Sequence, residues 1–240
     1  MNIFSKSLKD FFTLRFLLLS TFPFLMSFLI FGAIFLYGGS QFIGFLNSGG
    51  GNLAEVNPAV HPIINYILTL ALVKWVVVTF FYLFGTFFIL LLSVIIAVIV
   101  IGFFTPYIVK TIQEEHYPKF IRSEIPFSKV LVMYLKTAGI FLFLILVCIP
   151  LLIIPGINLF IFNVPFYYLF HNILLTDVGS NIESYERFKL ITKKEKKDFI
   201  TVTLTCYILS LIPFLGLFLQ VFFVIYLTHL FFEKSIQNSI

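Results

Sequence analysis

The segment CIPLLIIPGINLF, residues 148–160, is almost wholly apolar but contains Pro150, Pro155 and Gly156. Proline lacks a backbone N–H and clashes with the preceding helical turn, so it interrupts the helix that such an apolar run would otherwise form. The segment CYILSLIPFLGLF, residues 206–218, has the same design. Both segments therefore place a helix-breaking turn at the centre of a strongly apolar stretch.

The two segments form an internal repeat. A shift of 58 positions superimposes them and extends the match from YLFH to YLTH, so that His171 falls on His229. Nine of the 24 positions from Cys148 to His171 are identical, and the matched Cys, Pro and His are uncommon in this apolar sequence. We expect two similar helical hairpins, at residues 130–175 and 199–232.

The composition is that of a membrane protein. Of the 240 residues, 60% are hydrophobic and 11% are charged, and the mean hydropathy is +1.06. Soluble domains carry about 25% charged residues, so this chain lacks the polar surface that a soluble protein needs. We predict an all-α integral membrane protein with a single membrane domain over residues 1–240.

The net charge of +5 could indicate a nucleic-acid partner, but the basic residues lie in loops between apolar runs. That distribution favours membrane lipids, and not nucleic acid, as the partner. Cys148 and Cys206 lie inside apolar segments and have no metal or redox spacing. We expect both to be small buried apolar residues.

Two long transmembrane helices are predicted at residues 14–37 and 63–104. The first is longer than the apolar core of a signal peptide, which has about 7 to 15 residues. The second has 42 residues and one charge, Lys74. As one helix it would be about 63 Å long, twice the thickness of a bilayer core, so we expect its end to project from the membrane. Lys74 and Trp75 would then be anchors at the outer surface.

The distribution of positive charge predicts the topology. The loop at residues 38–62 has no Lys or Arg, whereas the other loops and both terminal regions contain basic residues. By the positive-inside rule only this loop lies outside, and the N- and C-termini are cytoplasmic. Each hairpin then starts and ends in the cytoplasm. Residues 200–212 would form about 20 Å of helix, too short for a hydrocarbon core of about 30 Å. The prolines therefore predict the tips of two re-entrant, hemi-penetrating helical hairpins.

The linker at residues 182–198 has an amphipathic pattern. Its apolar residues recur every three positions among charged ones. They are Ile182, Tyr185, Phe188 and Ile191. The pattern is typical of a helix lying on the inner membrane face, or of an ordinary cytoplasmic linker helix. Asp177, Glu183 and Glu186 lie beside this basic region, and we expect them to be solvated.

The sequence offers no constellation typical of an enzyme. It has no phosphate loop, no nucleophile elbow and no pair of carboxylates in an apolar segment, and the histidines at 61, 116, 171 and 229 lack ligand spacing. We therefore expect no enzymatic activity, no cofactor and no metal site.

Helices that begin at a turn inside the membrane present free backbone N–H groups, and such ends bind anions. This favours Gly156, Asn158 and Gly216 as anion contacts, together with Arg15 at the start of the first span. Ionisable or amide side chains in apolar segments are further candidates. These are Lys74, Asn163, His171, Gln220 and His229. The alternative is that these groups cap turns, join hairpins or anchor at the interface, and that Arg15 holds a lipid phosphate.

Several segments resemble the CysZ-type sulfate permeases, which form one broad family with the etoposide-induced membrane proteins. They are IIPGINLFIFNVPFYYLF (153–170), DVGSN (177–181), LIPFLGLF (211–218), FFTPYIVKTIQEE (103–115) and LRFLLLSTFPF (14–24). The resemblance implies two long spans, two hemi-penetrating hairpins, a turn at Pro106 after the long helix, and assembly into homo-oligomers.

The resemblance also implies an anion site. The family's sulfate-binding motif is a Gly-x-Arg-Arg turn before the first membrane helix. The corresponding stretch here is FTLRF (12–16), which keeps Arg15 but lacks the glycine and the other arginine. We expect a multi-pass permease of the bacterial inner membrane that passes sulfate or a related small oxyanion inward for cysteine biosynthesis. The alternative is a non-transporting membrane scaffold or assembly factor that acts through residues 182–198.

Overall fold

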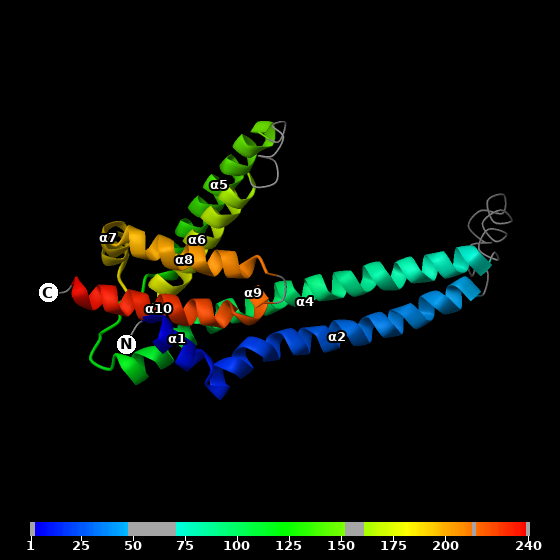
Figure 1. Ribbon diagram of the computed structural model, residues 1–240, viewed down its shortest axis with the longest axis horizontal. Coiled ribbons are helices and arrows are strands. Elements are labelled where there is room, and N and C mark those ends of the chain that lie inside the picture. The colour runs from blue at the N-terminus through cyan, green and yellow to red at the C-terminus, as the bar shows by residue number, and fades with distance from the viewer. Residues whose placement is uncertain (1–2, 48–70, 152–160, 213–214, 239–240) are drawn as a thin grey trace. The chain divides into compact units, whose positions relative to one another are not determined.

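The computed structural model describes residues 3–47, 71–151, 161–212 and 215–238, and throughout these ranges the regular structure is helical (Figure 1). The all-α prediction is confirmed for this part of the chain. The proposed hairpin tips at Pro155 and Pro213, and with them Gly156 and Asn158, lie outside the described residues. The re-entrant character of the hairpins therefore stays a prediction.

The chain divides into two compact units. One unit contains residues 22–97, and the other contains residues 1–21 together with residues 98–240. Helices α2 (Leu14–Asn47) and α4 (Ala71–His116) contribute to both units.

Within residues 22–97, α2 and α4 pack through aromatic rings. The ring of Phe35 stacks on Phe81 with centroids 5.2 Å apart and meets Tyr82 edge-on. Gly85 allows this approach, since a Cβ there would lie 2.1 Å from the Phe35 ring. Helices with small residues at the interface can approach closely, which is the usual device of membrane helices.

Two helices among the described residues are long and apolar enough to cross a membrane, namely Leu14–Gly44 of α2 and α5 (Phe127–Leu151). The helices continue past the predicted C-terminal ends of the two spans, α2 to Asn47 and α4 to His116. The turn that the resemblance places at Pro106 is not found. A proline removes one backbone hydrogen bond without forcing a helix to end, and α4 runs through it.

The core of the larger unit surrounds α10 (Gln220–Gln237), which is buried on nearly every face. A helix that is apolar all round is typically an interior helix. Helix α1 (Ile3–Phe11) packs on it, and the Phe11 ring lies edge-on to Phe222 at 5.7 Å. Figure 1 shows α8 (Lys196–Ser210) beside α10, and α6 (Asn163–Gly179) packs against both.

The two hairpins have helical arms. Helices α5 and α6 lie side by side, and α8 is followed by the short α9 (Leu215–Phe218) and by α10. Helix α8 has 15 residues, or about 22 Å, which is shorter than a hydrocarbon core. Cys148 and Cys206 are free and buried, which confirms their prediction as small apolar residues.

The linker contains helix α7 (Tyr185–Lys194), and a separate helix, α8, begins at Lys196. The apolar stripe of the linker is occupied by the protein's own core. Ile182 and Ile191 are buried, and the ring of Phe188 stacks on Phe231 with centroids 6.0 Å apart. The apolar stripe of α7 therefore packs against protein.

Two carboxylates that we expected to be solvated are not, and that prediction is wrong for them. Glu183 is only 2% exposed and pairs with Arg187 at 3.3 Å. Asp177 is half-buried and accepts a hydrogen bond from the Tyr134 hydroxyl. Both belong to segments that fold back on the core, which their local sequence does not indicate. Glu186 is exposed, as predicted.

Candidate functional site

A cavity of about 420 Å³ lies among α5, α6, α7 and α8. Four lysines line it, and they come from three different helices. They are Lys136 of α5, Lys189 and Lys193 of α7, and Lys196 of α8. None of the described residues that line the cavity is acidic. The cavity is therefore an electropositive pocket, called the lysine cavity below.

The lysine cavity also contains neutral polar groups. His171 lies on its wall. The other polar side chains are Thr137, Tyr168, Asn172, Thr176, Tyr185 and Thr192. Hydroxyl and amide groups can donate hydrogen bonds to an oxyanion while the lysines supply charge. The site suits a small anion with several oxygen atoms.

Local sequence explains how α7 builds one wall. Lys189 and Lys193 are four residues apart, so they project from the same face of the helix. Ile191, on another face of α7, is buried in the core. This burial fixes the rotation of α7 and directs its two lysines to the cavity. Lys189 also lies over the ring of Tyr185, with the amine 4.6 Å from the centroid.

Hydrogen bonds join the two hairpins beside this cavity. His171 Nδ1 lies 2.7 Å from Thr203 Oγ1, and the Tyr207 hydroxyl donates to Asn163 Oδ1 at 3.0 Å. Thr203 itself donates to the Phe199 carbonyl at 2.8 Å, so its oxygen can accept the Nδ1–H of His171. Asn163 thus forms a polar link between α6 and α8.

The other predicted contact residues that the structure describes lie outside the lysine cavity. Gly216 lies in α9, where an added Cβ would be 2.6 Å from the Ser210 carbonyl oxygen, so close backbone approach accounts for the glycine. Gln220 is the first residue of α10, and Lys74 lies in the first turn of α4. Of the predicted contacts that the structure describes, only His171 lines the lysine cavity, and the four lysines were not among the predicted contacts.

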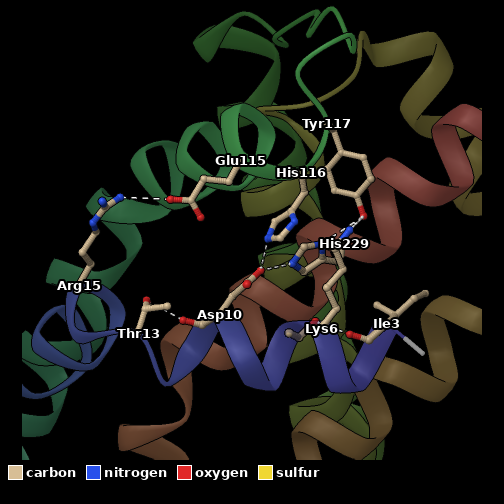
Figure 2. A network of polar contacts seen from close by, with 10 residues as sticks. Ile3, Lys6, Asp10, Thr13, Arg15, Glu115, His116, Tyr117 and His229 are labelled. Carbon is tan, nitrogen blue, oxygen red and sulfur yellow. Dashed lines mark hydrogen bonds and ion pairs between the residues drawn. The ribbon is translucent and has the colours of Figure 1, made fainter. Parts of the chain in front are cut away.

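Arg15 forms an ion pair with Glu115, with Nη1 3.1 Å from Oε1 (Figure 2). Its side chain is 69% exposed, so the pair contributes little to stability. Arg15 does not line the lysine cavity. The position that the resemblance assigns to sulfate thus has a carboxylate as its neighbour.

A second cluster joins Asp10 of α1, His116 of α4 and His229 of α10 (Figure 2). Oδ2 of Asp10 lies 2.9 Å from His116 Nε2 and 2.7 Å from His229 Nε2. Burial alone raises the pKa of the Asp10 carboxyl, but the hydrogen bond with His229 and charge attraction from the two histidines outweigh it, and the pKa lies below its usual value. The sequence does not indicate this cluster, because its members lie far apart in the chain.

Comparison with protein families decides the relationship. The family described as Sulfate transporter CysZ/Etoposide-induced protein 2.4 matches residues 3–220. The chain belongs to this family. Comparisons with curated proteins and with solved structures return no match. Membership confirms the resemblance seen in the sequence, and with the apolar helices it supports a sulfate-transporter-like membrane protein.

In this member of the CysZ/etoposide-induced family, the DVGSN segment begins with Asp177, and burial disfavours the charged form of its carboxyl group. Burial raises the pKa of Asp177 from 3.8 to about 6, although the hydrogen bond from Tyr134 acts in the opposite direction. The unfolded chain therefore ionises first as the pH rises. Folding stability is lost between about pH 4 and pH 6, by an amount on the order of 1–3 kcal/mol, and the loss stays constant above that range.

We expect Asp177→Asn to raise the melting temperature at pH 7.5 by several degrees, because the amide has no charge to bury and its oxygen can still accept from Tyr134. The gain should shrink towards zero at about pH 3, which lies below both pKa values, so that the Asp177 carboxyl is protonated in the folded and in the unfolded state. Thermal unfolding in detergent at the two pH values measures this. Glu124→Gln, which alters an exposed carboxyl of the same region, is the control. An equal gain in melting temperature at both pH values would show that burial does not raise the pKa of Asp177.

Proposed function

We propose that this protein is a membrane permease for sulfate or a related small oxyanion, and that the lysine cavity holds the anion at the cytoplasmic side of the hairpins. The observation that carries the proposal is the convergence of four lysines from three helices on one cavity without an acidic lining residue. Family membership supplies the transport class.

The affinity expected of the lysine cavity for an anion is suited to permeation. The four lysines are exposed, so each attracts an anion at 4 Å by only about 1 kcal/mol under water-like screening. Several such contacts together hold an anion briefly, and the hydroxyl groups of the wall add hydrogen bonds. Conduction needs a site that is favourable enough to fill and weak enough to empty. A deeply buried ion pair would release the anion too slowly.

The proposal includes the arrangement in the membrane. The protein would lie in the bacterial inner membrane with both termini in the cytoplasm, as the distribution of basic residues predicts. Each hairpin would enter from the cytoplasm, which places the lysine cavity on that side. Homo-oligomers would supply the closed path, and the imported sulfate would serve cysteine biosynthesis. Gly156, Asn158 and Gly216 would lie towards the tips, with Arg15 as a first contact.

The direct test is uptake of radiolabelled sulfate into liposomes that contain the purified protein, with chloride and phosphate as competitors. We expect saturable uptake that unlabelled sulfate abolishes. Protein orientation and insertion are checked by protease protection, and empty liposomes give the background. Uptake no greater than this background, from protein shown to be inserted and folded, would refute the permease proposal.

One observation favours a second candidate function, a membrane scaffold. The basic side of α7 and α8 includes Lys194 and Lys197, which are exposed and lie outside the lysine cavity. A scaffold would use this whole basic surface to hold acidic partners or anionic lipid. In that case the lysines inside and outside the cavity would matter equally, whereas a permease depends on those inside.

A further inference from the structure

The cluster of Asp10, His116 and His229 offers two imidazole nitrogens and one carboxylate oxygen to a common point (Figure 2). We propose that these three residues bind a divalent transition-metal ion, with zinc as the ion that fits best. The proposal is independent of anion transport, because none of the three residues lines the lysine cavity.

The three ligand atoms are arranged almost as they would be around a bound metal ion. The three ligand atoms all lie within 4.8 Å of one another, and Oδ2 of Asp10 is shared between the two Nε2 atoms. Zinc binds such atoms at about 2.0–2.2 Å, which places neighbouring ligands about 3.3 Å apart. The observed contacts of 2.9 and 2.7 Å would need to open by only about half an ångström.

One nitrogen of the cluster lacks a hydrogen bond. His116 Nε2 is buried and makes no hydrogen bond within the described part of the chain, although it lies 2.9 Å from Asp10 Oδ2. The contact has the distance but not the alignment of a hydrogen bond. Buried polar atoms are nearly always satisfied, so an orphaned nitrogen beside a carboxylate calls for another partner. A metal ion would satisfy it.

The surroundings orient the ligands as metal sites require. The Tyr117 hydroxyl lies 3.1 Å from His229 Nδ1 and fixes which ring nitrogen faces Asp10. Lys6 donates to the Tyr117 oxygen at 3.3 Å and holds the tyrosine in place. A metal-bound histidine usually uses its second nitrogen in this way, and the outer partner strengthens binding. His229 is fully buried, and the Asp10 side chain is 10% exposed.

The ligand types select the ion. Two nitrogens and one oxygen suit zinc and its transition-metal neighbours, whereas magnesium and calcium prefer oxygen ligands. Three protein ligands leave a position for water or for a further ligand. Because the ligands come from α1, α4 and α10, a bound ion would fasten the N-terminal helix to the end of α4 and to the core helix.

Zinc and magnesium binding can be measured by calorimetry and by metal analysis. The sample is the full-length protein in detergent, purified through a tag without histidine and stripped with a chelator. We expect one zinc per chain and no comparable magnesium binding. His116→Gln should lower zinc affinity by at least about 100-fold, and Tyr117→Phe by about tenfold. His171→Gln is the matched control, because this repeat-equivalent histidine bonds to Thr203 and should leave zinc binding unchanged.

A second readout guards against misfolding. Zinc should raise the melting temperature of the wild-type protein and of His171→Gln, but not that of His116→Gln, whose elution and helical signal should otherwise match the wild type. An ion that binds the folded protein but not the unfolded chain must raise the melting temperature. Absence of zinc binding by the wild-type protein, or unchanged affinity in His116→Gln, would overturn the proposal. Neither result bears on sulfate uptake.

Discussion

Replacing Lys193 and Lys196 together by glutamine is expected to lower sulfate uptake into liposomes at least about tenfold. Both side chains line the lysine cavity, one from α7 and one from α8. Each ammonium attracts an anion at contact by about 1 kcal/mol in a water-like environment. Loss of two such contacts weakens binding by about 2 kcal/mol, and 1.4 kcal/mol already corresponds to a factor of ten. Initial uptake rates at sulfate concentrations below saturation measure the effect.

The chain provides a matched control in Lys194 and Lys197. These lysines are sequence neighbours of the first pair and are exposed, but they do not line the cavity. The Lys194→Gln, Lys197→Gln double variant removes the same net charge and should keep at least half of the wild-type uptake. If both double variants lose uptake equally, the general positive potential of the surface acts rather than a site, and the lysine cavity is not where the anion binds.

The dependence of uptake on salt concentration also distinguishes a defined anion site from a general surface potential. A diffuse surface potential is screened over a Debye length of about 8 Å at physiological ionic strength. A direct contact at about 4 Å is shorter than this length, so salt weakens it less. The difference between the two double variants should therefore persist at higher concentrations of a salt whose anion does not compete with sulfate. This persistence would also count against the scaffold, in which all exposed lysines of α7 and α8 act alike.

Local chemistry was enough to predict the helices and the repeat. Strongly apolar runs, each interrupted by a proline at the matching position, predicted the α5–α6 and α8–α10 pairs, and the structure has helices there. Pro106 shows the limit of this approach. A proline lowers helix stability but does not by itself decide where a helix ends, and α4 continues through Pro106 to His116.

The surfaces that carry chemistry depend on tertiary contacts and could not be predicted. Apolar spacing predicted the stripe of α7, but only the contact of Phe188 with Phe231 shows that the stripe faces protein. That contact in turn determines where Lys189 and Lys193 point. The same holds for Asp177, whose neighbours in sequence suggested solvent but whose carboxyl meets Tyr134 from another helix.

The repeat also shows why equivalent positions need not have equivalent roles. His171 and His229 match in sequence, yet His171 bonds to Thr203 beside the lysine cavity, whereas His229 bonds to Asp10. The difference comes from what packs on each hairpin, namely the other hairpin in one case and α1 in the other. The repeat identified both histidines as candidates, but it carried no information about their partners.

Gly179→Ala is expected to destabilise the protein by about 2 kcal/mol or more, against the usual effect of this substitution. In an unconstrained helix, alanine is favoured over glycine by about 1 kcal/mol. Gly179 ends α6 directly against two rings, and an added Cβ would lie 2.4 Å from Phe188 and 2.7 Å from Phe231. Both rings are buried and stacked, so neither can turn away without breaking contacts in the core. Overpacking of this kind costs about 1–3 kcal/mol and occasionally more.

The measurement is the melting temperature in detergent, which should fall by about 4–8 °C for a loss of 2 kcal/mol in a protein of this size. Gly139→Ala in α5 is the matched control, since nothing lies within 4 Å of its added Cβ, and it should not lower the melting temperature. Because Phe188 also lines the lysine cavity, Gly179→Ala should reduce sulfate uptake at temperatures where the protein is still folded. Equal stability of the two variants would mean that the Phe188 and Phe231 rings can move apart, and the rotation of α7 would then need another cause.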